Sequence, residues 1–433
     1  MASTKLQLVF LAPFLALLFS SGALGAAAAE TTNNGTAAAV GRSSSLASAQ
    51  SGVFFSLDSF GARGDGSHDD APALARAWKA ACASPRPAVL LVPGGGKRYL
   101  LSSVVKLSGP CRSASVTVTV QGTLVASPNR ADWSGKDTRH WIVFRAVDGL
   151  TVSGGGVIDG NGEAWWKNSC KINKALPCKE APTALSFHYC TSLRVQDLKI
   201  VNSQQIHMSI EDCSNVQVAG LSITAPGTSP NTDGIHITRS NDVQVTNCKI
   251  KTGDDCISIE NGTHNLHVSQ VVCGPGHGIS IGSLGDDNSR AEVSGITIDS
   301  VQLYGTTNGA RIKTYQGGSG YARDIAFQNM VMGGVRNPII IDQNYCDKAK
   351  PCREQGSSAV EVSNVVFRNI RGTSTTKDAI KLSCSKNAPC HGITLQNIDL
   401  EMEGGNGAAE STCQNARWRK AGTVLPQPCT SQN

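Results

Sequence analysis

The sequence predicts an all-β protein built as a single-domain right-handed parallel β-helix, with a capping helix at its N-terminal side. Short segments of the form apolar-x-apolar recur from residue 193 onward, and no linker-like segment interrupts them. The 433 residues include 45 glycines, whereas only 5% are aromatic and 17% charged. This composition disfavours long surface helices and suits short strands joined by turns.

The repeating strand is the strongest of these observations. Its first four copies start at residues 193, 216, 243 and 266, which are 23, 27 and 23 residues apart. A variable period of this size is typical of solenoid coils whose turns tolerate insertions, with alternate side chains pointing inward and outward. A β-sandwich also has many short strands, but it gives no reason for one pattern to recur in every coil. The copies are Leu193–Val195, Val216–Val218, Val243–Val245, Leu266–Val268, Ile296–Ile298, Ile325–Phe327, Val365–Phe367 and Ile393–Leu395.

The N-terminal segment has the composition of a targeting signal. Lys5 is followed by an apolar run from Leu6 to Phe19 and by small residues through Ala29, which is typical of a cleaved signal peptide over residues 1–29. The apolar run is shorter than the ~20 residues that a membrane-spanning helix needs. Residues 30–51 are rich in Ala, Ser, Asn and Gly, and we expect a flexible leader there.

The β-helix is expected over residues 52–403, with both ends covered. Asp70 and Pro72 open a segment whose apolar stripe predicts an amphipathic helix with an N-cap carboxylate, placed over the first coil. Residues 404–433 are polar and carry Cys413 and Cys429, so we expect a disulfide-stapled tail outside the β-helix.

Fifteen cysteines, all after Ser51, fit an oxidising secretory route, and the odd number requires at least one unpaired or intermolecular thiol. Two glycosylation sequons begin at Asn34 and Asn261, and the second lies in an expected exposed turn. Spacing suggests the local pairs Cys170–Cys178, Cys346–Cys352 and Cys384–Cys390. Cys256 and Cys273 flank the coil from Asp255 to His277 and are expected to pair, with free thiols stacked in the core as the alternative.

Four polar segments stand out in adjacent coils: Asn231–Gly234, Gly253–Asp255, Gly276–Gly278 and Arg311–Lys313. Asp233 and Asp254 are 21 residues apart, and Asp254 and His277 are 23 apart, so each step is close to one coil. We therefore expect these groups to stack on one face, ~4.7–4.9 Å apart per coil. Each motif alone is more typical of a turn or a solvated surface. Their recurrence at the coil period predicts a catalytic face instead, because crowded carboxylates separate into an acid and a base.

In these four segments the chain resembles the plant polygalacturonases of glycoside hydrolase family 28. The resemblance extends from about Phe54 to Leu400 and includes Phe60–Gly66, Gly154–Gly160 and Asp342–Cys346. It implies hydrolysis, with inversion, of the α-1,4-linked galacturonan backbone of pectin.

The resemblance also implies roles for individual residues. Asp254 is expected to be the general acid, Asp233 and Asp255 to activate the attacking water, and His277 to tune the protonation of the acid. The expected substrate-binding residues are Asn231, Arg311, Lys313 and Tyr345.

Elementary chemistry agrees with these roles. Neighbouring residues in a regular strand point to opposite faces, so Gly253 is expected to permit a turn or bulge that lets Asp254 and Asp255 both reach the cleft. Arg311 and Lys313 supply the guanidinium fork and the ammonium group that a uronate carboxylate needs. Inverting hydrolysis requires the acid and base carboxyls to lie ~6.5–9.5 Å apart, which residues one or two coils apart can reach.

Two further features have an expected place beside the cleft or in the core. Gly282–Gly285 is expected to be a loop bordering the cleft, and no P-loop lysine follows it. Trp165, Trp166 and Tyr189 are candidates for sugar subsites or, alternatively, for core packing.

The net charge of +6 suits a polyanionic partner such as pectin. We expect a secreted, extracellular monomer of the cell wall that needs no cofactor or metal and binds neither nucleic acid nor membrane. Endo action is the preferred interpretation. The alternatives are an exo-acting enzyme, a pectate lyase that works by elimination with calcium, and a wall-binding protein without activity.

Overall fold

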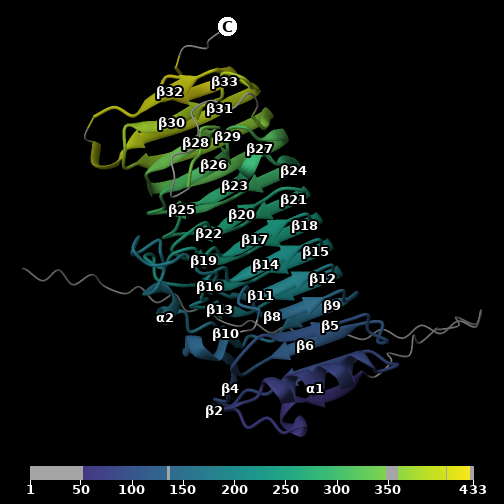
Figure 1. Cartoon of the computed structure of the whole chain (residues 1–433). Helices are drawn as coiled ribbons and strands as arrows, with labels where there is room; N and C mark the ends of the chain where they lie inside the picture. The colour runs from purple at the N-terminus through teal and green to yellow at the C-terminus, as the bar shows by residue number, and fades with distance from the viewer. Residues whose placement is uncertain (1–51, 134–136, 348–358, 406, 430–433) are drawn as a thin grey trace, which may run out of the picture. The chain divides into compact units, whose positions relative to one another are not determined.

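The computed structural model describes residues 52–133, 137–347, 359–405 and 407–429 (Figure 1). The expected signal peptide 1–29, the leader 30–51 and the sequon at Asn34 lie outside these residues. Helix α1 covers Ala71–Cys82 and α2 covers Glu163–Trp166. The short 3-10 turns are η1 (Leu57–Phe60), η2 (Arg130–Trp133), η3 (Asp286–Asn288) and η4 (Glu403–Gly405). Both α-helices fall short of the length and apolar character that a membrane span requires.

In the described part of the chain, one sheet has eleven strands that follow each other in chain order. Every pairing between its neighbours is parallel, so each coil of the chain contributes one strand and then returns to start the next. The strands are β5 (Val105–Ser108), β8 (His140–Arg145), β11 (Thr183–His188), β14 (Met208–Glu211), β17 (Ile235–Thr238), β20 (Ile257–Ile259), β23 (Ile279–Leu284), β26 (Asn308–Thr314), β28 (Asn337–Asp342), β30 (Asp378–Ser383) and β32 (Glu410–Gln414).

The remaining 22 strands among the described residues form a second sheet made of two parallel rows. One row contains β1 (Val53–Ser56), β3 (Ala88–Val92), β6 (Val116–Val120), β9 (Leu150–Ser153), β12 (Thr191–Gln196), β15 (Ser214–Ala219), β18 (Asn241–Thr246), β21 (His264–Ser269), β24 (Arg290–Asp299), β27 (Ser319–Val335), β29 (Glu361–Ser374), β31 (Cys390–Met402) and β33 (Ala416–Leu425). The other row contains β2 (Asp65–Asp69), β4 (Arg98–Leu101), β7 (Thr123–Ala126), β10 (Val157–Asp159), β13 (Lys199–Val201), β16 (Ser222–Thr224), β19 (Lys249–Lys251), β22 (Val272–Cys273) and β25 (Gln302–Tyr304).

The predicted parallel β-helix is therefore confirmed, and the eight predicted repeat segments all lie in the first row of the larger sheet. Leu193, Val216, Val243, Leu266 and Ile296 pair in one continuous register. All five are at most 1% exposed, which shows that the inward side chains of successive coils form one apolar column. Each coil buries its apolar side chains against its neighbours, so the core grows with every repeat.

Helix α1 covers the first coil, as predicted (Figure 1). Trp78 on its buried side meets Phe144 of β8 edge to face, with ring centroids 5.4 Å apart. The capping detail differs from the prediction, because the Asp70 carboxylate makes no bond to the helix and accepts hydrogen bonds from the Arg63 and Gly64 amides. Asp69 instead accepts a hydrogen bond from the amide of Ala71, at 3.1 Å. The side chain that caps the start of α1 is therefore Asp69, not the expected Asp70.

The C-terminal segment corrects the expected domain boundary. Strands β32 and β33 pair in parallel with β30 and β31, so this part of residues 404–433 forms a further coil and does not lie outside the β-helix. The expected staple is present as the disulfide Cys413–Cys429. The polar composition that suggested a tail reflects the exposure of an end coil, where only one side of each strand has a neighbour.

Three of the four suggested disulfide pairs are present, namely Cys170–Cys178, Cys256–Cys273 and Cys384–Cys390. Cys352, in the fourth, lies outside the described residues. Cys82–Cys111 joins the end of α1 to the loop after β5, which the sequence did not suggest. Among the described cysteines, Cys190, Cys213 and Cys248 are free and buried in the core.

Truncating a stacked core aromatic should destabilise the protein strongly. Phe327 and Phe367 lie one coil apart, both fully buried, with parallel rings 5.5 Å between centroids. Phe327→Ala should lower the free energy of unfolding by about 3–5 kcal/mol, because it removes a large apolar side chain and leaves a cavity. Urea unfolding followed by circular dichroism measures this change.

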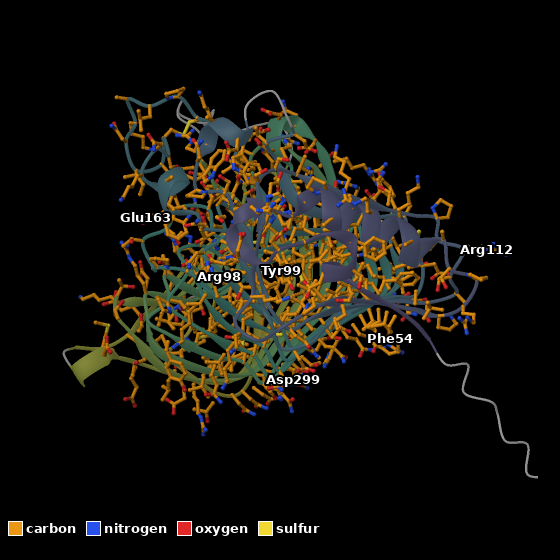
Figure 2. All side chains as sticks on the ribbon, turned by 90° about the horizontal axis from the view of Figure 1, so that it is seen from below. Phe54, Arg98, Tyr99, Arg112, Glu163 and Asp299 are labelled. Carbon is orange, nitrogen blue, oxygen red and sulfur yellow. A yellow bond between two sulfur atoms is a disulfide. The ribbon has the colours of Figure 1, made fainter. Side chains whose placement is uncertain are left out.

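Phe54→Ala is the matched control. Phe54 is 72% exposed and lies at the edge of the molecule (Figure 2). Tyr99, an aromatic residue of the same end of the β-helix, is by contrast fully buried. The control should change the free energy of unfolding by less than about 0.5 kcal/mol. Equal losses in the two variants would contradict the assignment of the apolar column.

Candidate active site

The predicted site residues lie at adjacent strands in the middle of the eleven-stranded sheet (Figure 1). Ile235 of β17 pairs with Ile257 of β20, which pairs with Ile279 of β23. Asp233, Asp255 and His277 each stand two residues before these strand positions. The expected stacking is therefore confirmed, with one difference: Asp255, not Asp254, holds the position in register with Asp233 and His277.

Asp255 is almost fully buried, at 1% exposure, and is bound on both carboxylate oxygens. Its Oδ1 accepts hydrogen bonds from Arg311 Nη2 at 2.7 Å and from Ser280 Oγ at 2.8 Å, while Oδ2 accepts one from Lys313 Nζ at 3.0 Å. Burial alone would raise the pKa of Asp255, but the charges of Arg311 and then Lys313 outweigh burial and lower it. Asp255 is thus held as a carboxylate in a fixed orientation.

Asp254 contacts a different partner from its neighbour. His277 Nδ1 lies 2.9 Å from Asp254 Oδ1, and this hydrogen bond raises the pKa of His277 above its ordinary value despite partial burial. The bend at Gly253, just before β20, lets both carboxylates reach the same side of the sheet, as expected. A Cβ atom on Gly253 would lie 1.9 Å from the carbonyl oxygen of Ser229, so glycine is required by the close approach of two coils.

Asp233 has the most strongly shifted carboxyl group of the three. Burial, followed by the negative charge of Asp254, raises its pKa from 3.8 to about 6. His236, on the strand that follows, places Nδ1 3.9 Å from Asp233 Oδ2 and partly opposes this shift. Asp233 therefore keeps its proton to a higher pH than an ordinary aspartate does.

The remaining predicted binding residues take different positions. Tyr345 follows β28 and presents its ring to Lys313 Nζ, 5.3 Å from the ring centroid. Asn231 lies in the turn before Asp233 with a left-handed backbone (φ 55°), which asparagine tolerates well, and lines a cavity next to the carboxylates. Arg311 and Lys313 are oriented toward Asp255 and are only 12% and 9% exposed at their side chains.

Sequence reasoning missed Ser280, His236 and Glu260. Ser280 donates a hydrogen bond to Asp255 and accepts one from Arg311 Nε at 2.8 Å, so it orients both groups. For His236 and Ser280 the available signal was the alternation of side chains along β17 and β23, since each lies two positions after a recognised motif, on the outward face of its strand. Glu260 is half-buried, and its partial removal from water raises the pKa of its carboxyl group.

Asp254, Asp255 and His277 each bring one potential ligand atom within 4.8 Å of the others, so this cluster has the composition of a metal site. Its donors are already engaged, however. Both oxygens of Asp255 accept hydrogen bonds from cationic side chains, and His277 uses Nδ1 on Asp254. A divalent cation would have to displace Arg311 and Lys313, so this arrangement fits proton transfer better than metal binding.

Three other expectations have different outcomes. Gly282–Gly285 is not a loop, because β23 runs through Leu284 and only Gly285 begins the turn after it. Tyr189 is 50% exposed and stacks under the Arg145 guanidinium, 4.6 Å from its ring centroid, whereas Trp165 is 7% exposed and packs edge to face against Trp133. Asn261 lies in an exposed turn, as expected, and its side-chain oxygen accepts a hydrogen bond from the Glu292 amide.

The family model for glycosyl hydrolases family 28 matches residues 82–423, which include every residue of the site described above. The chain belongs to this family. Among curated relatives, Polygalacturonase-2 of Solanum lycopersicum is 52% identical over 373 residues, covering 86% of this chain and 80% of the relative. A polygalacturonase of Persea americana is 54% identical over 362 residues, covering 83% and 76%.

Solved structures of lower identity share the fold of this family 28 glycosyl hydrolase. An endo-xylogalacturonan hydrolase from Aspergillus tubingensis superposes with a TM-score of 0.71 at 23% identity, covering 86% of this chain and 100% of the other. A polygalacturonase from Erwinia carotovora gives 0.66 at 22% identity, covering 86% and 95%. The parallel β-helix therefore persists where most side chains differ.

The raised pKa of Asp233 gives a stability prediction with a defined sign. A carboxyl group whose pKa is higher in the folded state loses stabilisation as pH rises from its unfolded value, near 4, to about 6. Asp233→Asn removes this ionisation and should raise the free energy of unfolding at pH 7 by up to about 3 kcal/mol, with little change near pH 4. Thermal unfolding midpoints measured from pH 4 to pH 7 test this.

Asp212→Asn serves as the comparison, because Asp212 is an acidic residue of the adjacent coil that Arg239 holds in an ion pair at 2.9 Å. It should not stabilise the protein at neutral pH. A parallel pH dependence in wild type and Asp233→Asn would show that Asp233 is not the group responsible.

Proposed function

We propose that this family 28 enzyme hydrolyses the α-1,4-galacturonosyl linkages of homogalacturonan, with inversion and by general acid–base catalysis. The observation that carries the proposal is the arrangement of three carboxyl groups with different surroundings beside two buried cations on one face. Asp255 is bound by Arg311 and Lys313, whereas Asp233 and Asp254 share excess negative charge. The names of the relatives from tomato and avocado support the same substrate.

Asp254 is the proposed general acid. Its carboxyl group contacts the imidazole of His277, with Nδ1 2.9 Å from Oδ1. When Asp254 gives its proton to the leaving oxygen, the hydrogen bond from His277 stabilises the carboxylate that forms. General acid catalysis of this kind contributes typically 10²–10⁴-fold to a rate.

Asp233 and Asp255 are the proposed pair that activates water. Asp255 stays ionised because Arg311 and Lys313 lower its pKa, and it is fixed by Ser280, so it can orient a water molecule without taking a proton. Asp233, with a pKa of about 6, is suited to accept the proton of that water as the bond to the sugar forms. Inversion follows if the water attacks from the face opposite the leaving group.

Arg311, Lys313 and Tyr345 are the proposed binding residues at the scissile bond. Arg311 has donors beyond those it uses on Asp255 and Ser280, and Lys313 lies beneath the Tyr345 ring. A uronate carboxylate placed here would share these cations with Asp255. Substrate binding and the orientation of the catalytic base would then depend on the same two side chains.

Endo action, secretion to the cell wall and a monomeric state complete the proposal. The cavity lined by Asn231 extends the site past Asp233, which gives room for a chain that continues beyond the cleaved bond. The disulfides of the folded part suit an oxidising, extracellular setting. Viscosity measured against reducing ends distinguishes endo from exo cleavage.

Asp254→Asn should reduce kcat by at least about 10³-fold while the protein remains folded, because the amide cannot donate the acid's proton. Reducing ends released from de-esterified polygalacturonate measure the loss, and near-ultraviolet circular dichroism checks the fold. Lys249 is an exposed residue of β19, so Lys249→Ala is a control that should retain wild-type activity. Near-normal turnover by Asp254→Asn would remove it from the mechanism.

Chelation should leave the reaction unchanged. With EDTA present, reducing ends should still rise, and no absorbance from unsaturated products should appear, since proton transfer by carboxyl groups needs no metal. Absorbance that is lost on chelation would indicate an eliminating lyase. A protein that binds polygalacturonate without producing either signal would instead be a non-catalytic binding protein.

A further inference from the structure

His207 contacts the turn that carries Asp233 from the preceding coil. It stands immediately before β14, is 0% exposed, and makes two contacts with one atom of that turn. Its backbone amide donates a hydrogen bond to the carbonyl oxygen of Asp233 at 2.8 Å, and its side-chain Nδ1 lies 2.9 Å from the same oxygen. A buried histidine thus holds the backbone of the proposed catalytic base, and no role assigned above uses it.

The turn between β16 and β17 is longer than the two catalytic turns that follow it. It contains the ten residues 225–234, whereas the turns before β20 and β23 contain five each, 252–256 and 274–278. The longer turn includes Pro226 and Pro230, which have no amide hydrogen to donate to an adjacent coil. A longer turn has more conformational freedom to lose, so the position of the carboxylate that it carries depends on specific contacts.

The later coil holds the same turn through Thr232. Thr232 Oγ1 accepts a hydrogen bond from the amide of Gly253 at 3.0 Å and lies 2.7 Å from Ser229 Oγ. The turn is therefore fixed to the later coil just before Asp233, and it is fixed to the earlier coil at Asp233 itself, through His207.

The aligned positions of the next coils have no comparable side chain. The residues that precede the paired positions of β14, β17, β20 and β23 are His207, Gly234, Cys256 and Gly278. Cys256 is in a disulfide, so within this set only His207 can donate a side-chain hydrogen bond. Burying an imidazole is unfavourable unless it is hydrogen-bonded, so the bond to the Asp233 carbonyl accounts for a histidine at this position.

The carbonyl oxygen decides which ring nitrogen of His207 carries the proton. Because a carbonyl oxygen only accepts hydrogen bonds, Nδ1 is the donor. Burial lowers the pKa of His207 to about 4, although the carbonyl groups of Asp233, Thr224 and Thr232 oppose this shift, so the ring is neutral above that pH. Nε2 is buried and has no hydrogen-bond partner among the described residues. The ring therefore acts on the turn through Nδ1.

We propose that His207 is a positioning residue for Asp233. As a neutral imidazole with its proton on Nδ1, it fixes the backbone of Asp233 so that the carboxyl group stays on the catalytic face. Asp233 interacts there with Asp254, Asp255 and His236, and its proton affinity depends on remaining among them. Since His207 is 0% exposed, it does not touch the substrate and acts through Asp233. This inference rests on the proposed function, because it takes Asp233 as the group that accepts a proton from water.

Three substitutions separate the contribution of Nδ1 from that of the ring. His207→Leu removes the donor, His207→Asn keeps an amide donor as many bonds from the backbone as Nδ1, and His207→Gln moves that donor one bond farther. His207→Leu and His207→Gln should lower kcat on de-esterified polygalacturonate about tenfold to hundredfold, with KM within about twofold of wild type, because the base is misplaced while the binding residues are unchanged. His207→Asn should keep kcat within about threefold of wild type. If His207→Leu does not fold, the comparison of His207→Asn with His207→Gln decides the same point.

The pH profile of kcat distinguishes positioning from a general loss of structure. Asp233 must be ionised to accept a proton, so kcat should rise with pH through the pKa of Asp233, which burial and then the charge of Asp254 raise to about 6. A looser turn lets water reach this carboxyl group. In His207→Leu and His207→Gln the rise should therefore move to lower pH, toward the ordinary value of 3.8, whereas His207→Asn should keep the wild-type profile.

Two control variants alter the protein away from this turn. Phe327→Ala destabilises the apolar column, in which Phe327 is fully buried. His264→Leu removes a comparable imidazole contact between coils, since His264 Nδ1 lies 2.9 Å from Ser294 Oγ. Assayed well below their unfolding midpoints, both variants should keep the wild-type kcat and the wild-type pH profile.

A measurement without turnover tests the contact independently. Asp233→Asn should raise the unfolding midpoint at pH 7, and this gain should be smaller in the His207→Leu or His207→Gln background, because a less confined Asp233 is less perturbed.

The outcomes separate the two proposals. If the wild type hydrolyses polygalacturonate, an unchanged kcat in His207→Gln, or a fall in kcat that His207→Asn does not restore, would overturn the positioning role alone. A wild type that hydrolyses no galacturonan would overturn the proposed function. The unfolding midpoints then still decide whether His207 holds Asp233, because a smaller gain supports that contact and equal gains in the two backgrounds refute it.

Discussion

The parallel pairing of successive coils is the constraint on which the rest of this structure depends. Ile235, Ile257 and Ile279 are fixed opposite one another by the ladder between β17, β20 and β23. A shift of one residue in that ladder would turn the buried side chains outward and remove the polar residues from the cleft. The same strand register therefore positions both the apolar column and the catalytic face.

The face shows how one side-chain type acquires different properties from its surroundings. Burial acts on both Asp233 and Asp255, and it disfavours the ionised form of each. The two cations on β26 reverse this effect for Asp255, whereas a neighbouring carboxylate reinforces it for Asp233. The charges that neighbouring coils place beside each aspartate therefore decide whether its pKa is lowered or raised.

Several departures from good packing lie near this face. Gln204, Trp165 and His236 leave buried polar atoms without partners, and Asn231 has a left-handed backbone. Elsewhere the described inward positions of the coils are filled by aliphatic and aromatic side chains. Proteins commonly violate local packing rules where a functional site needs them to.

The sequence by itself determined the β-helix, the approximate coil length, the α1 cap and the cluster of Asp233, Asp254, Asp255 and His277. These follow from periodicity, since a pattern that repeats once per coil must stack in space. Cys170–Cys178 and Cys384–Cys390 were accessible for a similar reason, because their partners lie close along the chain.

The tertiary structure decided what depends on contacts between coils. It placed Asp255 rather than Asp254 in register, directed Arg311 and Lys313 to Asp255, added Ser280 to that network and turned the expected tail into a coil through β32 and β33. Turn lengths between coils vary, so a count along the sequence locates a residue only to within one position. One position is enough to exchange the inward and outward faces of a strand, and only the hydrogen-bonded ladder removes that ambiguity.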